Sequence, residues 1–207
     1  MRHSSARLTR LFRIPRLAVR PAPSITHGGH FVDLAAIRVR EAEAAARHHG
    51  IVADYYDTLP DGRLHEAPAY HSHVMGAKIV SLVHKYDITA LASLGSDGFC
   101  GHPDHIVTHL GALDAQARLA EIGIYLPLLA LRSDGQGQVR ISVDSPQHKR
   151  RGLGLHRSQM LVDADGMLDP EFLEAHPRYR PLFEHESFDV ILPAAIGATA
   201  TRFDVAA

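Results

Sequence analysis

The sequence has little that could form a covalent or membrane framework. Among 207 residues it has one cysteine, Cys100, so no internal disulfide can form. A chain with a single thiol fits a reducing compartment, and we expect a cytoplasmic location. No apolar run approaches the ~20 residues needed to cross a bilayer. The longest candidate, Ile124 to Leu131, contains Pro127. The sequence therefore predicts no membrane span.

An excess of charge is also lacking. The formal net charge is -1, from 22 basic and 23 acidic residues. The charge balance thus gives no reason to expect nucleic acid or an anionic membrane as a partner. The length, together with an apolar content of 45%, predicts one α/β domain of ordinary globular composition.

Residues 1–23 differ from the rest, because six arginines occur there without an acidic residue and three prolines break any long helix. The segment is consistent with an organelle transit peptide. A disordered basic tail or a wrongly assigned start of the reading frame are the alternatives, which we favour. We expect residues 1–23 to lack stable packing and residues 24–207 to form the domain.

Helical and strand patterns alternate after residue 33, which predicts a mostly parallel sheet with helices on both faces. Asp33 can cap the first helix and Ser72 the second. The predicted helices are 34–49, 72–83, 106–119 and one that begins at Ser145-Pro146 and carries Lys149, His156, Ser158 and Gln159. The predicted strands are 51–56, 88–94, 138–144 and 187–192.

The sequence Gly-His-Pro-Asp-His at residues 101–105 places two imidazoles and a carboxylate where a strand leads into a helix. Ligands of open α/β sheets bind at the carboxyl ends of strands. Asp104 can accept a hydrogen bond from one histidine and fix its tautomer, so that the other can bind a metal. Alternatively, Pro103 simply opens the helix and Asp104 lies at its positive end. Spacing alone leaves both interpretations open.

Two further pairs have simpler explanations. Arg38 and Glu41 lie at i and i+3 of a predicted helix and can form a solvated ion pair. His109 lies one turn after His105 and could form a helical metal pair with it, but we expect His109 to face solvent.

Four stretches, in order, resemble the LmbE-like, or PIG-L, family of metal-dependent N-deacetylases. The most specific is Gly-Phe-Cys-Gly-His-Pro-Asp-His at 98–105. The others are Ile-Arg-Val-Arg-Glu at 37–41 with Ala44, Ala45 and Gly50, Leu-Pro-Asp-Gly-Arg-Leu at 59–64, and Lys149 with His156 and Ser158-Gln159. The likeness covers roughly residues 24–195.

This resemblance implies a Rossmann-like fold and hydrolysis of an N-acetyl group, often on an N-acetylglucosamine-type sugar, with zinc as the usual metal. His105 would be the metal ligand. His102 would stabilise the tetrahedral oxyanion and protonate the leaving amine, and Asp104 would orient His102. The residues implied to contact the substrate or support the site are Arg38, Glu41, Lys149 and His156.

The sequence departs from the family at its beginning. Family members start with a strand leading into Ala-His-Pro-Asp-Asp-Glu, which supplies two metal ligands and the general base, and this motif does not occur here. A catalytic zinc normally has three protein ligands, whereas the resemblance supplies only His105. Three explanations stay open: a lost true start, a degenerate and inactive sugar-binding relative, or recruitment of new ligands such as His27, His30 and Asp33.

We therefore expect the first βα unit to be missing. In a doubly wound sheet the first strand is usually central, so its loss would leave the backbone groups of neighbouring strands unpaired. Such a chain is predicted to express poorly, to aggregate, or to pair with another copy along the open edge as a homo-oligomer.

Overall fold

The computed structural model describes residues 24–25, 31–32, 34–54, 59–60, 62–175 and 177–193. The predictions for the basic segment 1–23, and for His27, His30 and Asp33 as ligands or cap, fall outside these described residues. Within the described helices, none is both long and apolar enough to cross a membrane.

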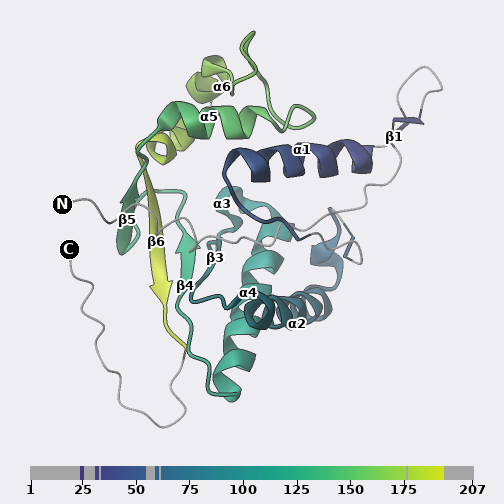
Figure 1. The fold of residues 1–207 in the computed structure, drawn as a ribbon, viewed down its shortest axis with the longest axis vertical. Helices are drawn as coiled ribbons and strands as arrows, with labels where there is room; N and C mark the ends of the chain where they lie inside the picture. The colour runs from purple at the N-terminus through teal and green to yellow at the C-terminus, as the bar shows by residue number, and fades with distance from the viewer. Residues whose placement is uncertain are drawn as a thin grey trace.

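The centre of the fold is an open four-stranded sheet (Figure 1). Its strands, in spatial order, are β3 (Leu91–Leu94), β4 (Leu128–Leu131), β6 (His185–Ile191) and β5 (Val139–Ser142). β3 and β4 are parallel, with Leu91 opposite Leu128, whereas β6 is antiparallel to both β4 and β5. The sheet is therefore mixed, and the prediction of a mostly parallel sheet is only partly right. A separate two-stranded ribbon joins β1 (Ser24–Ile25) to β2 (Phe31–Val32).

Helices pack beside the sheet and across one end of it (Figure 1). They are α1 (Leu34–His48), α2 (Pro68–Tyr86), α3 (Gly98–Gly101), α4 (Pro103–Glu121), α5 (Pro146–Gly154) and α6 (Pro170–Ala175), with 3₁₀ turns η2 (Leu64–Glu66) and η3 (Pro177–Phe183). Figure 1 shows α2 and α4 together beside the sheet, and α1 next to α5 across one end of it. The end of α1 and the start of α5 thus meet although they are far apart in the sequence.

The core lies between α2, α4 and the first two strands. Its members include Met75, Ile79, Val107, Leu119 and Leu128. Two glycines let the helices approach closely. A Cβ added to Gly111 would lie 2.9 Å from Met75 Cβ, and one added to Gly76 would lie 2.0 Å from Asp114 Oδ2. A side chain at either position would force the two helices apart or displace its neighbour.

Most predicted elements are present, with three corrections. α2 begins at Pro68 rather than Ser72, because proline is suited to the first position of a helix. Residues 51–54 form no strand, and the rest of that predicted strand includes residues outside the described part. α5 is capped by the Ser145 hydroxyl but ends at Gly154, so His156 and Ser158 follow the helix instead of lying on it.

Among the described strands β3 pairs with β4 alone, so it forms one edge of the sheet. A cavity of about 40 Å³ adjoins this strand, lined by Val52, Asp54 and residues of α2 as well as by Leu91 and Ala92. An additional strand could pair at this edge, next to the segment 51–54. Self-association through the edge stays a prediction.

Candidate active site

The connection from β3 to α4 follows the predicted strand, turn and helix. Gly98 and Phe99 have φ values of 64° and 66°, and for Phe99 this left-handed conformation is strained. Asp97 stabilises the turn, since Oδ1 accepts a hydrogen bond from the Phe99 amide at 2.9 Å and Oδ2 one from the Ser133 hydroxyl at 2.9 Å. The turn thus places residues 102–105 just beyond the carboxyl end of β3.

His102 caps the N-terminus of α4. Its Nδ1 accepts a hydrogen bond from the Asp104 amide at 3.2 Å. The neutral ring therefore carries its hydrogen on Nε2 and can donate it. Pro103 occupies the first turn, and the Asp104 carboxylate lies near the positive end of the helix dipole. The residues that open the helix are thus also those with the candidate chemistry.

Asp104 is only 6% exposed. Its Oδ1 accepts hydrogen bonds from the His65 backbone amide at 3.3 Å and from His65 Nδ1 at 2.9 Å. Burial raises the pKa of Asp104, but the bonds from His65 and the nearby His102 outweigh it, so this pKa lies below its usual value. Its Oδ2 is buried and has no hydrogen-bond partner among the described residues. Asp104 is therefore an ionised, buried carboxylate with one oxygen left over.

His65, on η2, is the residue that the sequence analysis missed. Asp104 was expected to bind the ring of a histidine in its own motif, but its side-chain partner is the ring of His65, 39 positions earlier. The only local signal was that His65 directly follows the stretch 59–64, which resembles the family.

His105 has the complementary tautomer. Its Nδ1 lies 3.0 Å from the Gly98 carbonyl oxygen, which can only accept, so Nδ1 donates and Nε2 carries the lone pair. This arrangement is typical of histidines that bind metals. The His105 and His102 rings lie with their centroids 4.8 Å apart, which confirms that the motif brings them together. The cavity beside β3 is lined by neither ring, and a shared cavity for them stays a prediction.

The other predicted site residues lie near α1 and α5. Glu41 accepts two hydrogen bonds from Ser158, from the amide and the hydroxyl, each at 2.7 Å. Lys149 donates to the Leu182 carbonyl at 2.7 Å and to the Glu186 carboxylate. These contacts join α1 and α5 to the C-terminal part of the fold, and none of those described for Glu41 or Lys149 reaches the His102 ring.

Arg38 and His156 are each half-buried, Arg38 on α1 and His156 in the segment after α5. A role for them at the substrate stays a prediction.

His109 does not face solvent, so that prediction is wrong. It is 4% exposed, and its Nδ1 lies 3.1 Å from the hydroxyl oxygen of Ser93 on β3. Burial lowers the pKa of His109, and a hydrogen bond with the Leu94 backbone and the charge of Asp97 oppose this shift only in part. His109 therefore packs α4 against β3 as a neutral residue.

A catalytic zinc at His105 would need two more ligands. Among the described residues, only His48, His49 and His148 form a group of three that could share a metal ion, and none of them belongs to the predicted site. The described residues around His105 therefore do not fit a complete zinc site.

Comparisons with known proteins agree with the motif. Residues 21–116 match the sequence model of the family described as PIG-L: GlcNAc-PI de-N-acetylase. No curated protein matches the chain in sequence.

Among solved structures, the A40926 pseudoaglycone deacetylase Dbv21 is similar with a TM-score of 0.53 and 21% identity, over 86% of this chain and 84% of that one. The zinc-inhibited form of teicoplanin deacetylase Orf2 has a TM-score of 0.52 and 18% identity, over 79% and 77%. At such identities the likeness concerns the fold. Residues 21–116 therefore match the PIG-L (LmbE-like) deacetylase family, and the chain has a fold similar to that of these solved deacetylases.

Proposed function

We propose that this protein hydrolyses the N-acetyl group of an N-acetylglucosamine-type sugar conjugate. The observation that carries the proposal is the pair of rings after β3, in which His102 presents an Nε2 hydrogen beside His105. The family description, GlcNAc-PI de-N-acetylase, and the two deacetylases of similar fold support the same reaction class.

His102 is suited to two steps of amide hydrolysis. Water adds to the acetyl carbon and loses one proton to the solvent, the carbonyl oxygen becomes negative, and the Nε2 hydrogen of His102 stabilises that charge. The carbon–nitrogen bond then breaks, and His102 passes to the leaving amine a proton that it takes up from the solvent, so that acetate and a free amino sugar result. His102 lies close enough to Asp104 for its charge to help lower the pKa of the Asp104 carboxyl. Asp104, itself held by His65, is a positioning residue in this scheme.

Zinc is the metal that the family resemblance implies, and we propose His105 as its ligand in this chain. Because the described residues supply only this ligand, no step above depends on the metal. We also propose a cytoplasmic location, supported by the single cysteine, and a homo-oligomer, supported by the open edge of β3.

A second candidate function is binding of the same sugar without hydrolysis. Among the described residues the ligand set around His105 is incomplete, which favours this candidate, because a site without a metal can still recognise an N-acetyl group through His102.

Acetate release from methyl N-acetylglucosaminide and from an N-acetylglucosaminyl lipid tests the proposal. We expect release that falls by about 100-fold or more in His102→Ala, the range for loss of a general acid. His84→Ala is the matched control, because His84 is an exposed histidine on α2. Calorimetric binding without acetate release would favour the second candidate. If the wild type neither binds nor hydrolyses, or if His102→Ala equals the wild type, the proposal is wrong.

A further inference from the structure

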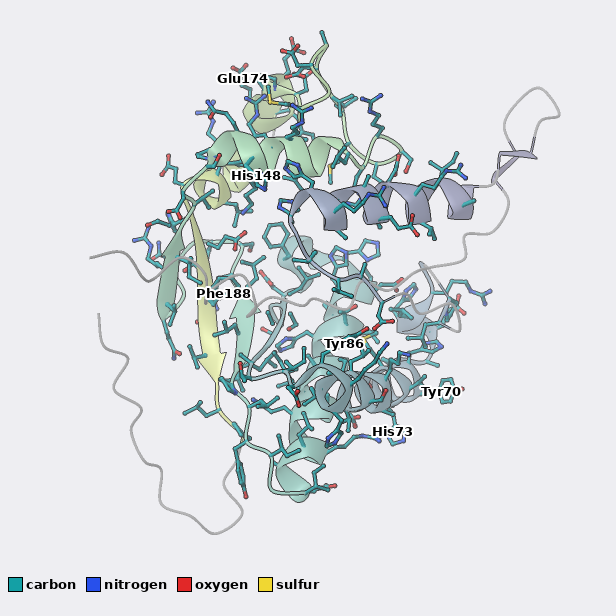
Figure 2. The ribbon with its side chains drawn as sticks, viewed as in Figure 1. Tyr70, His73, Tyr86, His148, Glu174 and Phe188 are labelled. Atoms are coloured by element: carbon teal, nitrogen blue, oxygen red, sulfur yellow. The ribbon has the colours of Figure 1, made fainter. Side chains whose placement is uncertain are left out.

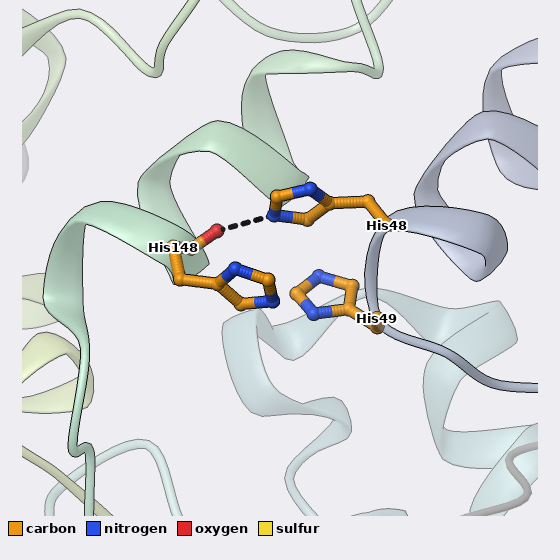
Figure 3. Close-up of side chains that lie close together, drawn as sticks. All are labelled: His48, His49 and His148. Atoms are coloured by element: carbon orange, nitrogen blue, oxygen red, sulfur yellow. Dashed lines mark hydrogen bonds between the residues drawn. The ribbon is translucent and has the colours of Figure 1, made fainter.

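Three histidines outside the predicted site meet where α1 ends and α5 begins. His48 is the last residue of α1, His49 follows it, and His148 lies in the first turn of α5 (Figures 2 and 3). One nitrogen of each ring lies within 4.8 Å of the other two. The motif reasoning did not include these residues, and His148 is 100 positions from His48 in the sequence.

We propose that His48, His49 and His148 bind a divalent transition-metal ion of the zinc type, at a site separate from His105. The rings are already close. His48 and His148 stack with centroids 3.9 Å apart, and His49 lies edge-on to both, at 4.9 Å from His48 and 5.1 Å from His148. Figure 3 shows the three rings converging from the two helix ends.

The remaining adjustment is small. With zinc–nitrogen bonds of about 2.0–2.1 Å, a tetrahedral site places its ligand nitrogens about 3.4 Å apart. The ligand nitrogens now lie within 4.8 Å of one another, so they must approach by up to about 1.4 Å, which side-chain rotation can supply. His48 Nε2 donates a hydrogen bond to the His148 backbone carbonyl at 2.8 Å, so the His48 ring is held next to His148.

The donor set selects the metal. Three imidazoles with no carboxylate suit zinc, nickel or copper, whereas calcium and magnesium prefer oxygen ligands. Three protein nitrogens also leave a fourth position for water, as in open zinc sites.

A glycine makes room for the cluster. Gly152 of α5 is buried, and a Cβ added there would lie 2.1 Å from His49 Nε2 and 2.6 Å from His49 Cε1. The backbone of α5 can thus approach the His49 ring only because residue 152 has no side chain. A metal here would link α1 to α5, and the bonds between Glu41 and Ser158 already join α1 to the segment after α5.

Zinc binding by the untagged chain tests the proposal. Equilibrium dialysis against Zn²⁺ followed by elemental analysis gives the stoichiometry. We expect His148→Phe, which keeps an aromatic ring for the stack but has no ligand nitrogen, to bind one zinc fewer than the wild type. His84→Phe is the control for loss of an exposed histidine, and His105→Phe separates this site from the motif. Both should keep this zinc.

A thermal readout keeps the test valid if one variant folds poorly. Because an ion that binds the folded state stabilises it, Zn²⁺ should raise Tm in the wild type and in His105→Phe. The rise should be lost in His148→Phe and in a second variant, His49→Gln. If His148→Phe and His49→Gln bind as much zinc as the wild type, or if zinc binding is lost only in His105→Phe, the cluster is not a metal site.

Discussion

The most informative single substitution in the candidate site is Asp104→Asn. Asp104 is buried and accepts two hydrogen bonds from His65, at 2.9 Å and 3.3 Å. An asparagine of the same shape can keep both bonds but loses the negative charge. Hydrogen bonds to a charged group contribute about 1.5–3 kcal/mol and neutral ones about 0.5–1.5 kcal/mol, so each bond weakens by about 1 kcal/mol. The 3.3 Å bond from the His65 amide contributes less to stability than the 2.9 Å bond from the His65 ring.

We therefore expect Asp104→Asn to lower the free energy of unfolding by about 1–2 kcal/mol. The oxygen Oδ2 has no hydrogen-bond partner among the described residues, and an amide nitrogen in its place would find none among them either. The substitution at that atom therefore changes the free energy of unfolding little. With a urea m-value of about 2 kcal/mol/M, the unfolding midpoint falls by roughly 0.5–1 M.

Urea unfolding at pH 7, followed by circular dichroism, measures the shift, and hydrogen exchange of the His65 amide gives a local readout that should speed up. The matched control is Glu66→Gln, a carboxylate-to-amide change at the residue next to His65. Glu66 forms an exposed ion pair with Arg63, so we expect little effect on stability. An Asp104→Asn protein as stable as Glu66→Gln, with unchanged exchange at His65, would refute the reasoning.

Three further predictions concern the packing of α4 against its neighbours. Gly111→Ala should lower the free energy of unfolding by about 1–3 kcal/mol, since its Cβ meets Met75; urea unfolding beside the exposed-site control Leu110→Ala measures this. Gln116→Leu removes the donor that binds the carbonyl oxygens of Leu126 and Ile191 at 2.9 and 2.8 Å, and should cost about 1–3 kcal/mol in the same assay; an unchanged midpoint would show that water replaces the donor. The pKa of His109 is lowered in the folded state, so as the pH falls this histidine takes up a proton in the unfolded chain first. The stability that the buried, neutral His109 contributes is therefore complete above about pH 6.5 and is lost below it. Between pH 7.5 and 5 the free energy of unfolding should therefore fall less steeply with pH in His109→Gln than in the wild type. An identical slope in both proteins would contradict this.

The local elements of the fold could be predicted from sequence because their signals are local. The predicted helix 34–49 is α1, and the alternating stretch 138–144 contains β5. The direction of strand pairing could not be predicted, because alternation is the same in parallel and antiparallel strands. β6 lies between β4 and β5 and runs against both, and nothing within residues 185–191 indicates that neighbour order.

The candidate site shows the same division. The pairing of His102 with His105 follows from their spacing at the start of a helix. The contact of His65 with Asp104 and that of His148 with His48 depend on how distant segments pack, so periodicity could not reveal them. The expected exposure of His109 was wrong for a related reason, because a polar residue can be buried wherever a partner such as Ser93 is available.

The central claim is that the N-acetyl group binds beside His102 at the end of β3. The most direct measurement is a titration of the ¹⁵N-labelled protein with N-acetylglucosamine, followed through the imidazole signals of its histidines. The account predicts saturable shifts for His102 and His105 and none for the exposed His84 of α2. Saturable shifts at His84 or elsewhere with unchanged His102 and His105 signals, or no shifts at all, would contradict it.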